Sequence, residues 1–312
     1  MSQNGLRPCI VVTGATSGIG QAMARSAAAK GLPIVLIGRS DDRLRGVADE
    51  ISKRGGEALV LKLDLLADDA AKQVKDFLDE NGLSCHVLVN SAGQGLQGLA
   101  ASQPLDAQLG LIDINARLLV ELTLSLIPGM LARRGGGVIN LGSLAGLVPG
   151  PQMAVYYATK SFVSSFSQAL SEELRGTGVT VTCVIPGPVE TGFLSGSGIK
   201  DLPLFRYLPT LSPENVADSA WRGFHRGRRL VKPGITSKLA ALVMSLVPLR
   251  FALPMINQAQ MRWSDPCPCG SGKKFIRCCG MAASTRRRFM GGPGLVERKP
   301  KTSKTQRGFR ET

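Results

Sequence analysis

Histidine and long apolar stretches are scarce in this chain of 312 residues. Its two histidines are His86, in an apolar strand-like run, and His225, among arginines, so nothing suggests the cleft histidine of a Ser–His–Asp hydrolase. The longest uncharged apolar stretch towards the C-terminus is residues 239–249, which is too short to cross a bilayer. Because no apolar signal segment precedes the first strand-like run, we expect a cytoplasmic protein.

Acidic residues are also scarce, but only in the last third of the chain. Residues 1–221 carry 18 Lys and Arg against 20 Asp and Glu, whereas residues 222–312 carry 20 against 3. A basic end of this kind is usually a solvated tail, and it also suits a partner with phosphate groups, such as a ribosome, another nucleic acid complex or anionic lipid. Residues 281–312 hold little to bury, and we expect a disordered basic tail there.

The seven cysteines fall into two groups. Three lie singly in apolar strand-like runs, as buried free thiols of a reducing compartment do: Cys9, Cys85 and Cys183. The other four form the pattern CxCx8CC: Cys267, Cys269, Cys278 and Cys279. Four thiolates can close a tetrahedral Zn²⁺ site with no open position, which makes such a site structural. Two disulfides or an iron–sulfur cluster are the alternatives, and a cytoplasmic setting disfavours the disulfides.

Short apolar runs alternate with segments of helical periodicity over the first two thirds of the chain. The runs are 9–14, 33–38, 57–63, 86–90, 137–142 and 179–185, with 229–234 as one further candidate. The helical segments between them include 18–30, 41–54, 67–80 and 153–175. Runs that are apolar on both faces predict parallel strands covered by helices, and the fold class is therefore α/β, a doubly wound parallel sheet or Rossmann fold.

Four segments follow from this organisation. We expect a nucleotide-binding domain over 1–235, a helical extension over 236–263, a zinc motif over 264–280 and the tail over 281–312. The extension is expected to form two short helices broken at Pro248 and Pro254. A stretch rich in Gly, Ser and Pro, residues 192–212, follows a strand and has the position of a lid over a crevice.

A glycine-rich turn lies between the first strand and its helix. Gly14, Gly18 and Gly20 are spaced GxxxGxG, which allows a tight turn and a close approach to a pyrophosphate at the helix N-terminus. After the second strand stands Arg39, where an acidic residue would bind the ribose 2′-hydroxyl of NAD. A cation there favours the 2′-phosphate of NADP(H) over NAD(H).

Tyr156 and Lys160 lie four residues apart, on one face of an expected helix. An ammonium beside a phenol favours the phenolate and lowers the pKa of the tyrosine towards neutral pH, as general acid–base chemistry requires. Tyr157 cannot form this i, i+4 pair. Ser143 ends a preceding strand, where its hydroxyl can polarise the same substrate oxygen.

These motifs together resemble the short-chain dehydrogenase/reductase family, over about residues 7–235. "TGATSGIG" matches the cofactor loop of the family, "NSAG" its NNAG motif with Ser91 in place of the second Asn, and "PGPVET" the segment over the nicotinamide. Asn115 completes the catalytic tetrad of the family with Ser143, Tyr156 and Lys160. The cofactor-binding residues that the resemblance and the motifs imply are Gly14, Thr16, Ser17, Gly18, Ile19, Gly20, Arg39, Asp64, Asn90, Ala92, Gly93, Tyr156, Lys160, Pro186, Gly187, Val189 and Thr191.

The resemblance implies reversible hydride transfer between NADP(H) and a carbonyl/alcohol pair. Tyr156 would donate the proton in reduction, Ser143 would bind the substrate oxygen, Lys160 would hold the nicotinamide ribose, and Asn115 would hold a relay water. It also implies a homo-oligomer. The apolar tract 235–256 could extend the pocket, touch a membrane surface or simply pack on the core, and its organisation is similar to family members that act on lipid-like ketones, including ketosphinganine-type reductases.

The second cysteine group, within residues 264–280, resembles the SEC-C zinc motif, which in the bacterial translocation ATPase contacts the export chaperone. The primary hypothesis is an NADP-dependent reductase of a hydrophobic carbonyl with this motif as an appendage. The alternative is a binding protein on the reductase fold, whose basic, zinc-bearing end docks a protein, ribosome or membrane partner.

Overall fold

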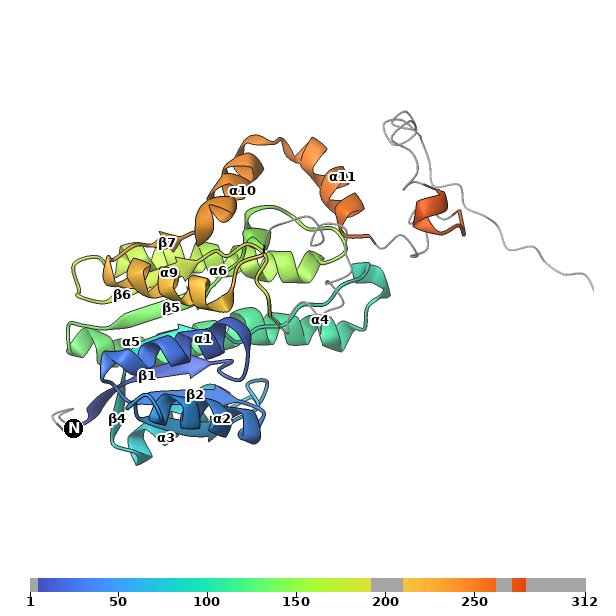
Figure 1. The fold of residues 1–312 in the computed structure, drawn as a ribbon. Helices are drawn as coiled ribbons and strands as arrows, with labels where there is room; N and C mark the ends of the chain where they lie inside the picture. Colours follow the sequence, from blue (N-terminus) through green and yellow to red (C-terminus); the bar gives the residue numbers. More distant parts are fainter. Residues whose placement is uncertain (1–4, 192–209, 262–270, 279–312) are drawn as a thin grey trace, which may run out of the picture. The chain divides into compact units, whose positions relative to one another are not determined.

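The computed structural model of this chain describes residues 5–191, 210–261 and 271–278 (Figure 1). The chain divides into two compact units, residues 1–262 and 263–312. Three of the four clustered cysteines, Cys267, Cys269 and Cys279, lie outside the described residues, as do the expected tail and most of the expected lid. The strands and the α-helices all belong to the first unit.

Seven parallel strands form the centre of this unit, in the order β3-β2-β1-β4-β5-β6-β7. They are β1 (Arg7–Thr13), β2 (Ile34–Gly38), β3 (Ala58–Lys62), β4 (Leu83–Asn90), β5 (Gly137–Leu141), β6 (Thr180–Val184) and β7 (Leu230–Val231). The six expected strands are confirmed, and the candidate at 229–234 contains the short seventh. The predicted Rossmann-like sheet is therefore present.

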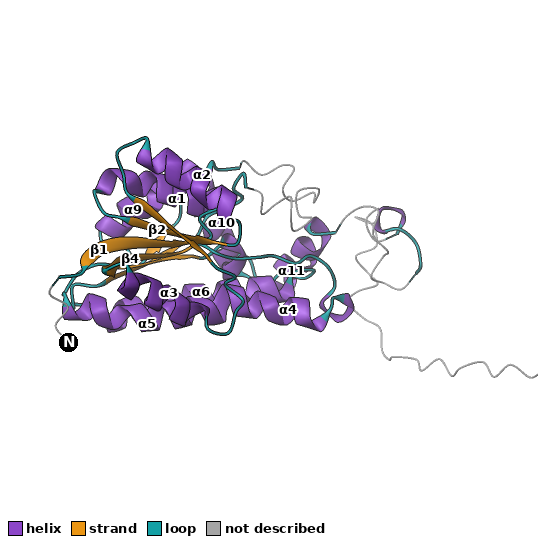
Figure 2. Ribbon diagram, turned by 90° about the horizontal axis from the view of Figure 1, so that it is seen from below, coloured by secondary structure: helices purple, strands orange, loops and turns teal. Residues whose placement is uncertain are grey.

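Helices cover both faces of the sheet, as Figure 2 shows. One face carries α1 (Gly18–Ala27), α2 (Asp41–Ser52) and α9 (Pro213–His225), and the other carries α3 (Ala70–Glu80), α5 (Leu118–Ala132) and α6 (Ala154–Glu173). Because side chains alternate along a strand, Ile10 and Val12 enter the first core while Cys9 and Val11 enter the second. This explains why the strands are apolar throughout. Cys9, Cys85 and Cys183 are buried free thiols, as expected.

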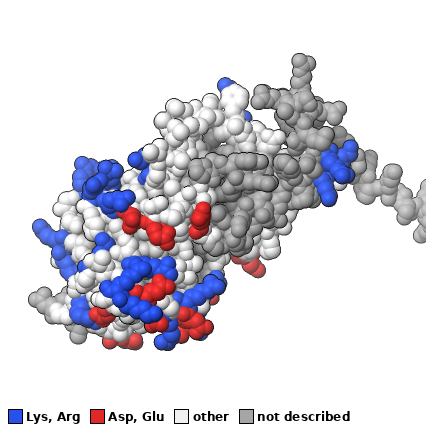
Figure 3. All heavy atoms as spheres, in the orientation of Figure 1, with Lys and Arg blue, Asp and Glu red and all other residues white. Residues whose placement is uncertain are grey.

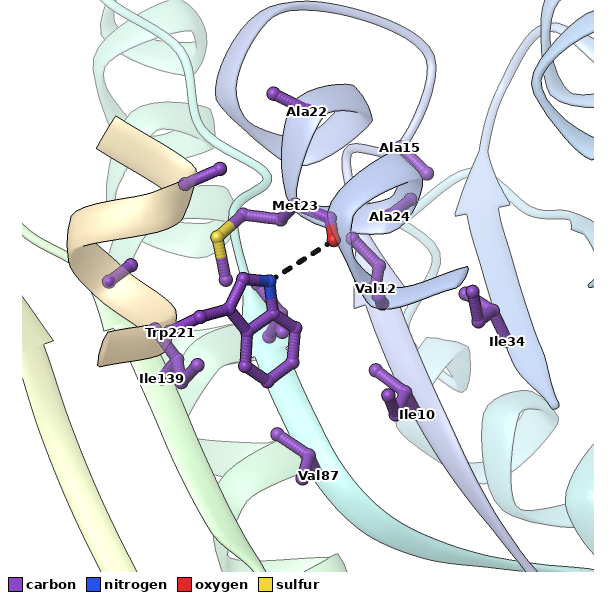
Figure 4. Close-up of a cluster of buried hydrophobic side chains, with 14 of the residues drawn as sticks. Ile10, Val12, Ala15, Ala22, Met23, Ala24, Ile34, Val87, Ile139 and Trp221 are labelled. Carbon is purple, nitrogen blue, oxygen red and sulfur yellow. Dashed lines mark hydrogen bonds between the residues drawn. The ribbon is translucent and has the colours of Figure 1, made fainter. Parts of the chain in front are cut away.

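The packing of α9 on α1 fixes the first helix over β1 (Figure 4). The Trp221 indole is buried between these helices and the sheet, and its Nε1–H donates to the Met23 carbonyl oxygen at 3.3 Å. A buried indole needs such a partner for its one polar group. The middle of α1 is thereby held against α9.

Two helices follow the sheet, α10 (Gly234–Leu246) and α11 (Leu249–Ala259). Pro248 separates them, as expected, but the expectation that Pro254 breaks a helix is wrong, because Pro254 lies inside α11. A proline removes one helical donor, and hydrogen bonds on either side persist, from Ala252 N–H to the Pro248 carbonyl and from Gln260 N–H to the Ile256 carbonyl.

Candidate active site

A cavity of about 740 Å³ lies where the strand order reverses, between β1 and β4. The segments that leave the carboxyl ends of β1, β4, β5 and β6 all line it, which is the usual ligand crevice of a doubly wound sheet. The sequence-predicted site residues on its wall are Gly14, Thr16, Ser17, Gly18, Ile19, Arg39, Asp64, Ala92, Gly93, Ser143, Tyr156, Lys160, Pro186, Gly187, Val189 and Thr191. Gly20, Asn90 and Asn115 stand behind this wall.

Gly14 and Gly20 in the glycine turn lie so close to neighbouring backbone atoms that a residue with a Cβ would not fit at either position. Gly14 has φ +66°, in the left-handed region, and a Cβ on it would lie 2.9 Å from the Ala92 backbone. A Cβ on Gly20 would lie 2.3 Å from the Gly14 carbonyl oxygen. The Thr13 hydroxyl accepts from the N–H groups of Ser91 and Ala92, each at 3.1 Å, and so ties this turn to the segment after β4. The backbone around the turn is consequently a narrow, preformed cradle.

Arg39 and Asp64 stand at the far end of the cavity, after β2 and β3. Both are exposed, and Asp64 Oδ1 accepts from Leu66 N–H at 3.1 Å. Within the described ranges Arg39 forms no ion pair, whereas Asp41, at the start of α2, pairs with Arg45. A cation therefore borders this end of the cavity.

Asn90 belongs to a buried polar chain behind the cavity. Its Nδ2 donates to Thr123 Oγ1 at 3.0 Å and to Asn140 Oδ1 at 2.9 Å, and Asn140 donates in turn to Ser167 Oγ at 2.9 Å. These groups connect β4, β5, α5 and α6. In this structure Asn90 fixes the ends of the strands that carry the site.

Asn115 lies in a π-helical turn, Asp113–Arg117, between α4 (Leu105–Ile112) and α5. Its side-chain amide exchanges two hydrogen bonds with the backbone of Gln94, accepting from N–H at 3.0 Å and donating to the carbonyl at 2.9 Å, and donates to Thr159 Oγ1 at 3.2 Å. A Cβ on Gly93 would lie 2.9 Å from Asn115 Oδ1 and 3.6 Å from Lys160 Nζ. Asn115 and Lys160 therefore flank the same glycine.

Lys160 is a buried ammonium on the cavity wall, 7% exposed. Its Nζ donates to the Leu141 carbonyl oxygen at the end of β5, at 2.9 Å. Burial lowers the pKa of Lys160 from its usual 10.5 to about 8. The side chain is thus positioned by the strand end and holds its proton only weakly for a lysine.

Tyr156 and Ser143 meet on the same wall through a hydrogen bond between their side chains. Burial raises the pKa of Tyr156 to about 12, and the Ser143 hydrogen bond acts in the opposite direction. The pKa of Tyr156 is therefore raised overall, whereas a dominant effect of Lys160 would have lowered it. Lys160 Nζ lies 5.9 Å from the centroid of the Tyr156 ring and donates one hydrogen bond to the Leu141 carbonyl oxygen, and desolvation of the phenolate is the larger effect on the pKa.

The C-terminal helices supply residues that sequence reasoning missed. Leu239, Ala240, Val243 and Met244 of α10 line the cavity, so this part of the tract 235–256 extends the pocket, which is one of the three possibilities that the sequence left open. Gln260, only 1% exposed, donates through Nε2 to the Tyr157 hydroxyl, beside Tyr156. No spacing or motif links residues 103 positions apart, so only the fold reveals this contact.

Comparison with known proteins gives two family matches. The short chain dehydrogenase family matches residues 8–200, and the SEC-C motif matches residues 264–280. Sulfoacetaldehyde reductase 2 of Chromohalobacter salexigens is 38% identical over 219 residues, covering 67% of this chain and 85% of that protein. The very-long-chain 3-oxoacyl-CoA reductase of Bos taurus is 38% identical over 186 residues, covering 58% of this chain and 59% of that protein.

A solved structure agrees with these relatives. The short-chain dehydrogenase from Sphingobium yanoikuyae, in complex with NADPH, superposes with a TM-score of 0.68 at 28% identity, covering 77% of this chain and 96% of that chain. The family match covers β1 to β6 and most of the residues that line the cavity, but not α10. The chain therefore belongs to the short-chain dehydrogenase family and is an NAD(P)-dependent oxidoreductase that acts on CH–OH groups and their carbonyl products.

Proposed function

We propose that this enzyme uses NADPH to reduce the carbonyl of a hydrophobic, lipid-like substrate, with Tyr156 as the general acid. The observation that carries the proposal is one cavity whose lining has three different parts. The glycine turn and Arg39 form the part that suits a dinucleotide, and α10 contributes an apolar wall. Tyr156, Ser143 and Lys160 line the same cavity.

The cavity fits a nicotinamide cofactor because Gly14, Gly18 and Gly93 line it, so that backbone without side chains faces a bound pyrophosphate there. The cofactor supplies the hydride. Tyr156 donates its proton to the substrate oxygen, and the raised pKa ensures that it carries that proton at neutral pH. The Ser143 hydroxyl, bonded to the same phenol, orients the substrate oxygen. Lys160, whose pKa is lowered to about 8, would hold the nicotinamide ribose, and Asn115 positions the backbone beside it.

The preference for NADP(H) rests on Arg39. It lines the cavity after β2 and has no ion-pair partner in the described part of the chain, so its charge is available to a 2′-phosphate. Arg39→Ser should lower kcat/KM for NADPH by roughly 10- to 100-fold, since a hydrogen bond to a charged group contributes about 1.5–3 kcal/mol. The value for NADH should change less than twofold.

The control is Arg43→Ser, because Arg43 is exposed on α2 and does not line the cavity. Arg43→Ser should leave the ratio of NADPH to NADH efficiency unchanged. Equal loss with both cofactors in Arg39→Ser would show that Arg39 does not read the 2′-phosphate.

The substrate class rests on the apolar wall. Leu144, Met153, Val243 and Met244 line the cavity together with Tyr156, and the apolar residues of α10 outnumber its two polar lining residues, Thr236 and Ser237. The name of the bovine relative supports a long acyl substrate, whereas the name of the Chromohalobacter relative points to a small polar aldehyde. We give more weight to the lining because it belongs to this chain.

A series of ketones of increasing chain length tests the substrate class, with NADPH oxidation as the assay. Each buried methylene contributes about 0.8 kcal/mol, so kcat/KM should rise about fourfold per carbon until the wall is filled. Met244→Glu should flatten this dependence, and Ser245→Glu, on an exposed neighbour that does not line the cavity, should not. Tight NADPH binding without turnover of any carbonyl would favour the alternative, a binding protein on this fold.

We also propose that the four clustered cysteines bind a structural Zn²⁺, as their spacing and the SEC-C match suggest. Of the four, the described residues include Cys278, whose half-buried sulfur accepts a hydrogen bond from Ser271 Oγ at 3.2 Å. The described residues contain no group of three or more metal ligands. Wild-type protein purified without chelator should carry about one Zn²⁺ per chain. The variant Cys269→Ser should lack this Zn²⁺, and the control Cys85→Ser should retain it. Less than about half an equivalent of Zn²⁺ in the wild type would contradict the proposal.

A further inference from the structure

The two C-terminal helices expose a row of large apolar side chains. We define the α10–α11 face as Ile235, Leu239, Leu242, Val243, Leu246, Leu249, Phe251 and Met255. All eight are exposed, and the exposed fractions reach 82% for Ile235, 72% for Leu246 and 67% for Met255. Figure 1 shows the two helices standing beyond the layer of sheet and helices. Contiguous apolar surface of this kind marks an interaction site with protein or membrane.

The charged side chains of these two helices have one sign. Lys238 and Arg250 are exposed on the same two helices, and the Arg250 guanidinium lies 4.8 Å from the centroid of the Phe251 ring. No Asp or Glu occurs between residues 219 and 264. In Figure 3 the surface over α10 is mostly white, with blue side chains at its border. An apolar face bordered by cations alone is complementary to anionic headgroups above acyl chains.

The face is continuous with the wall of the active-site cavity. Leu239 is 59% exposed and Val243 is 50% exposed, yet both line the cavity that contains Tyr156. Ala240 and Met244, one position further along the helix, are half-buried and line it as well. An apolar path therefore leads from the outer surface of α10 to the catalytic tyrosine.

We propose that the α10–α11 face docks on an anionic phospholipid bilayer, so that the cavity receives its carbonyl substrate from the lipid side. This rests on the proposed function, because a lipid-like substrate is what gives the docking its purpose. The proposed contact is peripheral. None of the described helices is long and apolar enough to span a membrane. The apolar side chains enter the interface, and Lys238 and Arg250 bind phosphate and carboxylate groups of the lipids.

A bilayer suits this face better than a second copy of the chain. In a symmetric dimer the same patch contacts itself, and the two helices that form it carry no acidic residue to pair with Lys238 or Arg250. Anionic lipids supply the missing negative charge. A dimer through this face is an alternative outcome of a vesicle-binding experiment.

The test is cosedimentation of the full chain, saturated with NADPH, with vesicles of phosphatidylcholine alone or with 30% phosphatidylserine. The variant Leu242→Asp/Leu246→Asp alters two exposed positions that do not line the catalytic cavity. The matched control is Leu105→Asp on α4, where Leu105 is 68% exposed. All three proteins keep the same residues after 261, so any contribution of the basic end is equal in them.

We expect wild type to bind the phosphatidylserine vesicles at least tenfold more tightly than phosphatidylcholine alone. The double variant should bind them at least tenfold more weakly than wild type, and the control within twofold of it. Equal binding by wild type and the double variant would overturn the proposal, because another part of the chain would then carry the contact. Absence of vesicle binding, together with an oligomer that the double variant dissociates, would overturn it in favour of a second copy.

Turnover of a short, water-soluble ketone separates this proposal from the proposed function. The double variant should retain wild-type turnover of that ketone, which also shows that it is folded. Vesicle binding that depends on Leu242 and Leu246 without turnover of any carbonyl would refute the reductase activity and leave the docking intact. Turnover of that ketone without vesicle binding would support the reductase activity and refute the docking.

Discussion

Gly20→Ala places a single methyl group where the glycine cradle has no room for it. Gly20 is buried in the first turn of α1, and its Cβ would lie 2.3 Å from the Gly14 carbonyl oxygen. An ordinary contact is 3.4 Å or more, so helix or turn must move by about 1 Å. α1 cannot retreat easily, because Met23 and Ala24 are fully buried against the core that contains Trp221.

The expected cost can be compared with a matched control on α2. Overpacking costs about 1–3 kcal/mol, and the better helix propensity of alanine returns about 1 kcal/mol. Gly46→Ala, with nothing within 4 Å of its Cβ, should gain about 0.4–1 kcal/mol. Gly20→Ala should therefore melt several degrees below Gly46→Ala, at about 2–4 °C per kcal/mol.

Cofactor binding gives the decisive readout for Gly20→Ala. NADPH at 100 times its Kd stabilises a protein by about 2.7 kcal/mol, and a tenfold weaker Kd reduces this to about half. Displacing the turn by about 1 Å should raise the Kd for NADPH at least tenfold, since a misplacement of about this size can reduce the efficiency of an active site by as much as about 100-fold. Thermal denaturation with and without NADPH measures the difference. A cofactor-induced shift as large as that of Gly46→Ala would refute the account of the cradle.

Two further predictions concern the buried polar groups beside the cavity. The pKa of Lys160 is lowered to about 8, so the unfolded chain binds more protons between pH 8 and about 10.5 and stability rises across that window. If Lys160→Met has a higher free energy of unfolding than wild type at pH 7, the difference between the two proteins should therefore be smaller at pH 9.5, as measured by urea unfolding. A difference that stays constant or grows would contradict the burial of the ammonium. Gln260→Leu should destabilise the chain by about 1–3 kcal/mol by leaving the Tyr157 hydroxyl without its donor. Adding Tyr157→Phe should recover part of that loss, and strictly additive effects would show that the two side chains are not coupled.

Much of the fold follows from the sequence because local pattern and tertiary role agree there. The runs around Ile10, Ile34 and Val138 are apolar on both faces, which only a covered parallel strand requires, and each lies in a strand. Pro254 shows the limit, since it lies inside α11 although it removes one helical donor. The π-helical turn around Asn115 is a tertiary feature that no periodicity announces.

The proposed catalytic set can be predicted from the sequence because its residues stand at strand ends and one helix turn apart. Ser143 follows β5, and Tyr156 and Lys160 share one face of α6. The electrostatics were not accessible, because burial, which raises the pKa of Tyr156, depends on the elements packed over it. The contact of Gln260 with Tyr157 joins distant segments and likewise needed the structure.

Hydride transfer by two tyrosine variants tests the central claim most directly. Tyr156→Phe should bind NADPH with the Kd of wild type and lower kcat for a hydrophobic ketone by about 10²–10⁴-fold, the usual contribution of a general acid. Tyr157→Phe, one residue away and facing Gln260, should retain kcat within about tenfold. Wild-type turnover by Tyr156→Phe, or equal losses in the two variants, would contradict the assignment of Tyr156 as the proton donor.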